Sequence, residues 1–225
     1  MASPAPPHVP VIPPPRFFFG VSLGAVVFFA VWTWIMHGDD LRAFDRSCAE
    51  YWHDWSAGHP GPWEWMVFLT GMGGVPAMVI LAIMGSIWQT AINHRALAFA
   101  WLGVVIAGGL VNVASKDLID RDRPSRDICD RAVLEENKSY PSGHAMGSAI
   151  GYGLLGYALI LPQRHRPRRI AAVLLILGIV LAIGFSRIYL RAHWFSDVIG
   201  GWSIGLAWLF FCLGWLEHWR RLRLK

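Results

Sequence analysis

The stretch YPSGHAMGSAIGYGLLGYALIL, residues 140–161, joins a polar turn with a histidine to a run from Ala145 to Leu161 that has no charged side chain. About 17–25 predominantly apolar residues are needed to cross the hydrocarbon core of a bilayer as a helix. The stretch therefore predicts a membrane-spanning helix that begins at the membrane surface, with Ser142, Gly143 and His144 at its entrance.

The composition of the whole chain agrees with a membrane protein. Of the 225 residues 55% are hydrophobic and only 16% are charged, whereas a soluble domain carries about 25% charged residues. The second uncharged run is longer than a span needs and contains Pro76, so we expect it to be tilted or kinked. We predict an all-α polytopic helical bundle with six transmembrane helices: Phe17–Met36, Trp65–Asn93, Ala96–Ser115, Ala145–Leu161, Ile170–Ser186 and Val198–Leu216.

The ends of the chain differ from this central part. Residues 1–15 contain seven prolines without periodicity, which is typical of a disordered, polyproline-like tail. The first apolar run is long and has no small-x-small cleavage pattern after it, so we interpret it as a retained span rather than a signal peptide. We expect one six-span domain over residues 16–216 and a basic cytoplasmic tail over residues 217–225.

Basic residues in the short connections predict the orientation. Residues 163–169 and the C-terminal tail are rich in arginine, and short basic loops face the cytoplasm. Both termini are therefore expected in the cytoplasm, in a membrane of bacterial inner-membrane type. The net charge of +5 follows from this topology and does not indicate nucleic-acid binding.

The first loop on the opposite face spans residues 36–62. Its apolar residues recur at helical spacing, which favours a short helix lying in the membrane interface; a helix packed on the neighbouring loops fits nearly as well. Cys48 in this loop and Cys129 both fall on the outer face, where they could form a disulfide. The helical positions are Leu41, Phe44, Cys48, Tyr51, Trp52 and Trp55.

Three polar segments that are far apart in the chain meet at this outer face by the predicted topology. They are KDLIDRDRP (116–124) after the third span, PSGH (141–144) before the fourth, and SRIYLRAHWFSD (186–197) between the fifth and sixth. Polar residues at span ends usually mark no more than a membrane boundary. The residue types in these segments are more specific than that.

The three segments together contain the groups that phosphate chemistry needs. Lys116, Arg123 and Arg187 supply cationic donors for phosphoryl oxygens. Ser142 and Gly143 precede a helix, where unpaired N–H groups and the positive end of the helix dipole attract an anion.

Two histidines could carry out the chemistry beside these donors. His193 and Asp197 are four residues apart and share a helix face, so the carboxylate could orient the imidazole for nucleophilic attack. His144 would then donate a proton to the leaving oxygen.

These residues resemble the signature of the type 2 phosphatidic acid phosphatase family, K-x6-R-P, P-S-G-H and S-R-x5-H-x3-D. The spacing matches from Lys116 through Arg123-Pro124 and Pro141–His144 to Ser186-Arg187, His193 and Asp197. The resemblance implies a lipid phosphatase that works without metal or cofactor, with His193 as nucleophile, Asp197 orienting it and His144 as general acid. It also implies that the substrate phosphate is held by five groups: Lys116, Arg123, Ser142, Gly143 and Arg187.

Other interpretations of the polar residues are weaker. Asp120-Arg121-Asp122 could suggest an aspartyl nucleophile or a metal site, but solvated loop charges are favoured because no buried strand precedes it. Arg191 and Glu64 are expected to be headgroup-facing anchors. Two other function classes remain. A non-catalytic protein that binds or transports lipid phosphates would not need the His–Asp pair, and a vanadium haloperoxidase would not have the six predicted spans.

Overall fold

The computed structural model describes residues 12–92, 95–160, 163 and 165–222. Most of the proline-rich tail, part of the turn at residues 93–95, Arg164 and the last three residues of the basic tail lie outside these ranges. Within them the chain is helical and forms no strand, which confirms the all-α prediction. The elements are α1 (Pro15–Met36), α2 (Asp39–Gly58), α3 (Trp63–Gly73), α4 (Val75–Ala91), α5 (Arg95–Ile119), the 3-10 helix η1 (Arg131–Val133), α6 (Gly143–Ile160), α7 (Arg166–Tyr189) and α8 (Phe195–Leu222).

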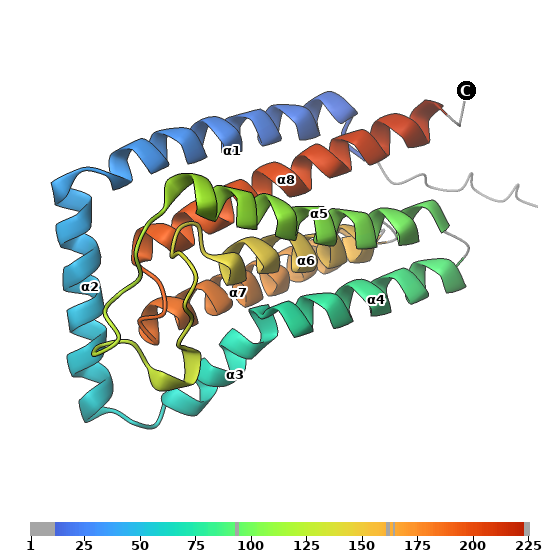
Figure 1. Ribbon diagram of the computed structural model, residues 1–225. Coiled ribbons are helices and arrows are strands. Elements are labelled where there is room, and N and C mark those ends of the chain that lie inside the picture. Colours follow the sequence, from blue (N-terminus) through green and yellow to red (C-terminus); the bar gives the residue numbers. More distant parts are fainter. Residues whose placement is uncertain (1–11, 93–94, 161–162, 164, 223–225) are drawn as a thin grey trace, which may run out of the picture.

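Helix α6 lies at the centre of the bundle and contacts α3, α4, α5, α7 and α8, while α1 runs along α8 on one side (Figure 1). Small residues allow the close packing of α6 on α8. A Cβ added at Gly201 would lie 2.6 Å from the carbonyl oxygen of Ser142, and one at Gly205 would lie 2.9 Å from that of Met146. This packing fixes the start of α6, which holds His144, against the start of α8, which holds Asp197.

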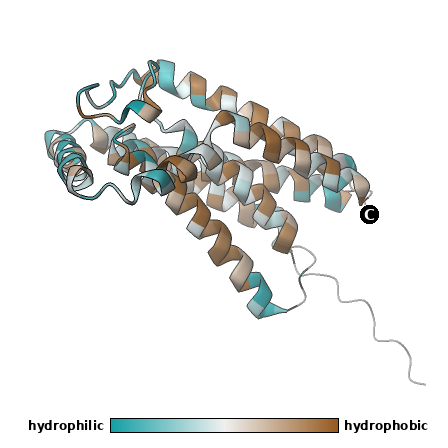
Figure 2. Ribbon diagram, turned by 90° about the horizontal axis from the view of Figure 1, so that it is seen from below, coloured by the Kyte–Doolittle hydropathy of each residue, from teal (hydrophilic) through white to brown (hydrophobic). Residues whose placement is uncertain are grey.

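Four helices, α1, α5, α7 and α8, are long and apolar enough to cross a membrane, and the bent pair α3–α4 would make a fifth. The pair bends by 52° at Gly74, which confirms the kink expected in the second run, with Pro76 in the first turn of α4. Helix α6 is not among these helices because its glycines and His144 lower its mean hydropathy. Hydrophobic residues follow the long helices, as Figure 2 shows, so the chain is an integral membrane protein.

Helix α2 runs across one end of the bundle (Figure 1). It has 20 residues and is therefore longer than the short helix expected from the sequence. One side packs on the protein: the ring of Trp52 lies 5.2 Å from that of Phe185 and 5.5 Å from that of Tyr189. Phe44 and Tyr51 are exposed, so α2 shows features of both alternatives, a packed helix with outward-facing aromatics.

Both cysteines considered for a disulfide, Cys48 and Cys129, are free thiols in this structure, as is Cys212.

Candidate active site

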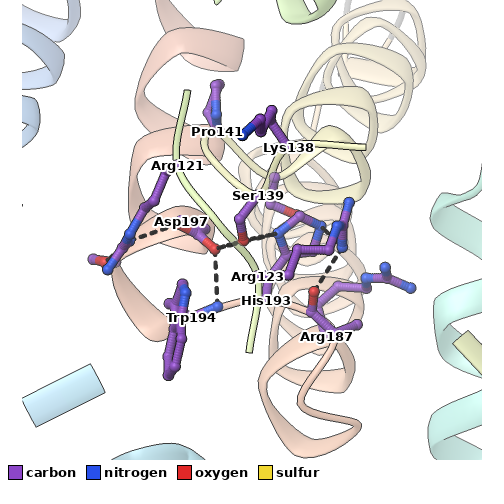
Figure 3. Close-up of polar contacts among 12 residues, drawn as sticks. Arg121, Arg123, Lys138, Ser139, Pro141, Arg187, His193, Trp194 and Asp197 are labelled. Carbon is purple, nitrogen blue, oxygen red and sulfur yellow. Dashed lines mark hydrogen bonds and ion pairs between the residues drawn. The ribbon is translucent and has the colours of Figure 1, made fainter. Parts of the chain in front are cut away.

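The structure brings the three polar segments together beside α2, as the predicted topology required. Lys116 lies in the last turn of α5 and Arg187 in the last turn of α7. His144 is in the first turn of α6, and Asp197 is in the first turn of α8. Figure 3 shows Arg121 and Arg123 of the first segment beside Asp197 and His193 of the third.

The start of α8 orients Asp197. The carboxylate oxygen Oδ2 accepts the backbone N–H of Trp194 at 2.9 Å, while the N–H of Asp197 donates to the carbonyl of Trp194 at 3.1 Å. The first of these bonds is one half of a capping box, in which the side chain at the third helical position satisfies the N–H of the N-cap residue; the second is a backbone turn bond. The same oxygen lies 3.4 Å from Nδ1 of His193 and accepts a hydrogen bond from the hydroxyl of Ser139.

The other ring nitrogen of His193 is available for chemistry. With Nδ1 turned to Asp197, the lone pair of Nε2 faces Arg123, whose Nη1 lies 3.2 Å away. Burial, together with the nearby charges of Arg187, Arg123 and Lys116, lowers the pKa of His193 well below its ordinary value. The imidazole is therefore neutral at physiological pH, which is the form that can attack phosphorus.

The two predicted phosphate-binding arginines, Arg123 and Arg187, share one carboxylate in this structure. Glu135 accepts from Nη2 of Arg123 at 2.8 Å and pairs with Nη2 of Arg187. Burial by itself would raise the pKa of Glu135, but Arg187 and Arg123 outweigh it and lower the pKa to about 2. Nε of Arg187 is buried and has no partner among the described residues. A planar pair of guanidinium groups with a spare buried donor suits a tetrahedral oxyanion.

The remaining predicted phosphate ligands surround the start of α6. The ammonium group of Lys116 donates to the carbonyl of Lys138 and, at 3.4 Å, to that of Ser139. The hydroxyl of Ser142 accepts the N–H of Ala145 at 3.4 Å, which caps the helix. A Cβ at Gly143 would lie 3.0 Å from Oδ1 of Asn112, so a side chain would crowd the start of α6.

His144 packs against the bend between α3 and α4, with Nε2 3.6 Å from the position of a Cβ at Gly74. It precedes the predicted span that begins at Ala145. Burial, followed by the charge of Arg187, lowers the pKa of His144 to about 3. Both imidazoles are therefore neutral before a substrate binds, and an anionic phosphate would offset the positive charges that lower the pKa of His144.

Several residues of the site were missed or interpreted differently from the sequence. Arg121, interpreted there as a solvated loop charge, donates from Nη1 to Oδ1 of Asp197 at 2.6 Å. Ser139 and Glu135 carried no motif signal. Arg191 is buried instead of facing the headgroups: it donates to the carbonyls of Ile128 (2.5 Å) and Trp52 (3.2 Å), and so ties the turn after α7 to the connection before η1 and to α2.

Comparison with known proteins gives a consistent set of relatives. The model of the PAP2 superfamily matches residues 96–221. The chain is 36% identical over 119 residues to phosphatidylglycerophosphatase B of Bacillus subtilis, covering 52% of this chain and 56% of that protein. It is 29% identical over 155 residues to an undecaprenyl-diphosphatase of Sulfolobus acidocaldarius, covering 65% of this chain and 66% of that protein.

A solved structure has the same fold. The crystal structure of a transmembrane PAP2 type phosphatidylglycerolphosphate phosphatase from Bacillus subtilis matches with a TM-score of 0.73 and 25% identity, over 88% of this chain and 96% of that one. The chain thus spans nearly all of this structural relative, but only about half to two thirds of the length of the relatives matched by sequence.

Proposed function

Because the chain belongs to the PAP2 superfamily, we propose that it is a membrane lipid phosphatase that hydrolyses phosphomonoesters or diphosphates of lipids through a phosphohistidine intermediate. The observation that carries the proposal is the buried His193, whose Nδ1 lies beside Asp197 and whose Nε2 faces Arg123, one of the two arginines that share Glu135. A protein that only bound or transported lipid phosphates would not require a histidine oriented for attack.

In the first step Nε2 of His193 would attack phosphorus while the phosphorus–oxygen bond to the lipid breaks. The proton on Nδ1 stays on the ring, where Asp197 stabilises the developing positive charge. The departing alkoxide, or phosphate in the case of a diphosphate, takes a proton from His144. Since His144 is neutral before the substrate binds, the proton that it passes on enters with the substrate as the phosphate monoanion.

In the second step water would attack the phosphorylated His193, with His144 accepting a proton from that water. The phosphorus–nitrogen bond breaks, and inorganic phosphate leaves. Charge on the transferring group would be balanced by Lys116, Arg123 and Arg187, supported by the N–H groups at Ser142 and Gly143, so we propose a reaction without metal or cofactor.

The proposed topology has six spans, with α6 from Ala145 onward as the fourth and the α3–α4 pair as the second. Both termini would be cytoplasmic, α2 would lie in the outer interface, and the site would be at headgroup depth on the periplasmic face of a bacterial inner membrane. A lipid substrate could then remain in the outer leaflet while its phosphate reaches His193. Undecaprenyl diphosphate, phosphatidylglycerophosphate and phosphatidic acid are the candidate substrates, in line with the names of the Bacillus and Sulfolobus relatives.

The proposal is tested by phosphate release from this panel of lipids in detergent micelles, with His193→Ala as the blank. We expect turnover by the wild-type protein in excess EDTA and no turnover by the variant. An acid-labile phosphate label, as expected for phosphohistidine, should form on the wild-type protein alone. Full activity of His193→Ala, or loss of activity in EDTA that Mg²⁺ restores, would contradict the mechanism. Oxidation of halide by hydrogen peroxide in the presence of vanadate, without phosphate release, would instead identify a haloperoxidase.

A further inference from the structure

Arg121 lies between two buried carboxylates at the edge of the proposed site (Figure 3). Its Nη1 donates to Oδ1 of Asp197 at 2.6 Å, and its Nη2 donates to Oδ2 of Asp45 on α2 at 2.7 Å. The side chains of Asp45 and Asp197 are 1% and 0% exposed. One guanidinium group therefore joins helix α2 to the carboxylate that orients His193.

Asp45 is itself fixed to the start of α8. Its Oδ1 accepts the backbone N–H of Ser196 at 3.0 Å, and its Oδ2 accepts the hydroxyl of Ser196 at 2.5 Å. Ser196 directly precedes Asp197 in the chain. Asp45 thus contacts both Arg121 and the residue next to the orienting carboxylate, so that its removal would loosen two attachments at once.

The charges of Asp45, Arg121, Asp197 and His193 together suit the reaction better than they suit a purely structural role. Burial raises the pKa of Asp197, and Arg121 opposes this rise. With both carboxylates ionised, the two carboxylates and one guanidinium group carry a net charge of −1, and the neutral His193 adds none. When Nε2 attacks phosphorus, the imidazole ring becomes positive, and the four groups together become neutral. Preorganised charge of this kind stabilises a transition state more than the ground state.

We propose that Arg121 and Asp45 are positioning residues for the reaction: Arg121 keeps Asp197 ionised and turned toward His193, and Asp45 holds Arg121 in place and supplies the second negative charge. This inference rests on the proposed phosphatase function. The competing explanation is that the pair only fastens α2 to the bundle, in which case the variants would lose stability without a specific change in catalysis.

The test uses the purified full-length protein and three variants, Asp45→Asn, Arg121→Gln and the double variant. For Asp45→Asn we expect kcat to fall about 10-fold to 100-fold, the equivalent of one hydrogen bond to a charged group, with little change in KM. Glu50→Gln and Arg46→Gln are matched controls, because both side chains are exposed on the same helix and should leave kcat and KM unchanged.

Arg121→Gln should do more damage, because two buried carboxylates then face each other without a cation. We expect kcat at neutral pH to fall by about 100-fold or more and the acid limb of the pH–rate profile to move to higher pH, since Asp197 takes up a proton. Arg121→Lys should return the limb toward its wild-type position and restore only part of kcat. The charged and titratable groups around Asp197 are Arg121, Asp45 across the guanidinium group, Lys116, His193 and Tyr140.

The double variant gives the sharpest distinction. If Asp45 acts through Arg121, Asp45→Asn lowers kcat in the wild-type background but raises it in the Arg121→Gln background, because it removes one of the two unpaired carboxylates. If Asp45 and Arg121 only fasten α2 to the bundle, Asp45→Asn should lower kcat in both backgrounds. Additive losses, or kcat values per correctly folded protein equal to the wild type, overturn the inference.

The same data separate this inference from the proposed function. A wild-type protein without turnover on the lipid panel refutes the phosphatase and the positioning role together. An active wild type whose Asp45 and Arg121 variants keep the wild-type kcat and pH profile refutes the positioning role alone. Thermal unfolding of each variant shows whether a change in rate reflects lost protein or lost positioning.

Discussion

Glu135 occupies the place where the two arginines of the proposed site would hold a phosphoryl group. One of its oxygens accepts from Arg123 at 2.8 Å and the other pairs with Arg187. An entering phosphate needs the same donors, so it must displace this carboxylate. We therefore predict that Glu135→Gln binds phosphate-like anions more tightly than the wild-type protein.

The size of the effect follows from the pKa of Glu135, which the arginines lower from 4.5 to about 2. A difference of that size corresponds to about 3 kcal/mol of interaction with the charged carboxylate, and the side chain is 29% exposed, so part of this is screened. We expect the Ki of orthovanadate to fall about 10-fold to 100-fold, where each factor of ten is about 1.4 kcal/mol.

The sign of the pH dependence gives a second check on Glu135. Because its pKa is lower in the folded state, the carboxylate stabilises the fold above about pH 4.5, and this contribution is lost as the pH falls through about 2. The carboxylate is therefore ionised across the working range of the enzyme. Competition with phosphate should not weaken between pH 5 and pH 8 in the wild-type protein.

The assay is inhibition of phosphate release by orthovanadate, together with thermal unfolding of the same samples. Glu135→Gln should lower the Ki and also lower the melting temperature, because Arg123 and Arg187 lose their shared counter-charge. Glu136→Gln is the matched control: Glu136 is 91% exposed and lies 3.4 Å from Arg126, so neither quantity should change. An unchanged or higher Ki in Glu135→Gln would show that the carboxylate organises the arginines instead of competing with the substrate.

Three further predictions concern the proposed acid, the pH profile and the topology. His144→Ala should lower kcat about 10²-fold to 10⁴-fold as expected for loss of a general acid, and full activity in this variant would exclude that role. Burial keeps the pKa of His193 well below 6.5 and that of His144 at about 3, so kcat/KM should show no acid limb near pH 6.5. It should instead fall above the second pKa of the substrate phosphate, about 6. An acid limb at pH 6.5 in the measured profile would contradict this. In intact cells a cysteine at Ser125 should react with an impermeant maleimide and one at Gln163 only after permeabilisation, and the reverse pattern would invert the orientation.

The candidate site residues whose place in the fold follows from the sequence are those fixed to helix ends. Lys116, His144 and Asp197 lie where an apolar run begins or ends, and a span end can be located to within a turn from the loss of hydrophobicity. Parity through the spans then places these ends on the same face. The kink in the second run follows in the same way, from an over-long run with Pro76.

The residues that the sequence does not reveal lie in the connection from Asp120 to Tyr140 or on α2. This connection has no hydrophobic period, so nothing in the sequence indicates which side chains turn inward. Arg121 lies between two aspartates and resembles a solvated loop charge, yet its side chain is only 14% exposed. Asp45 is separated from Asp197 by most of the chain, and only the crosswise course of α2 brings the two together.

The charge balance of the site accounts for one of these unrevealed residues, Glu135. Lys116, Arg123 and Arg187 in a closed site carry three positive charges, and burying them without a counter-charge is costly. A carboxylate from a neighbouring segment is therefore required when no phosphate is bound. The end of α5 and the connection that follows it contain many carboxylates with equal standing in the sequence, and only the contacts with both arginines select Glu135. The candidates are Asp117, Asp120, Asp122, Asp127, Asp130, Glu135 and Glu136.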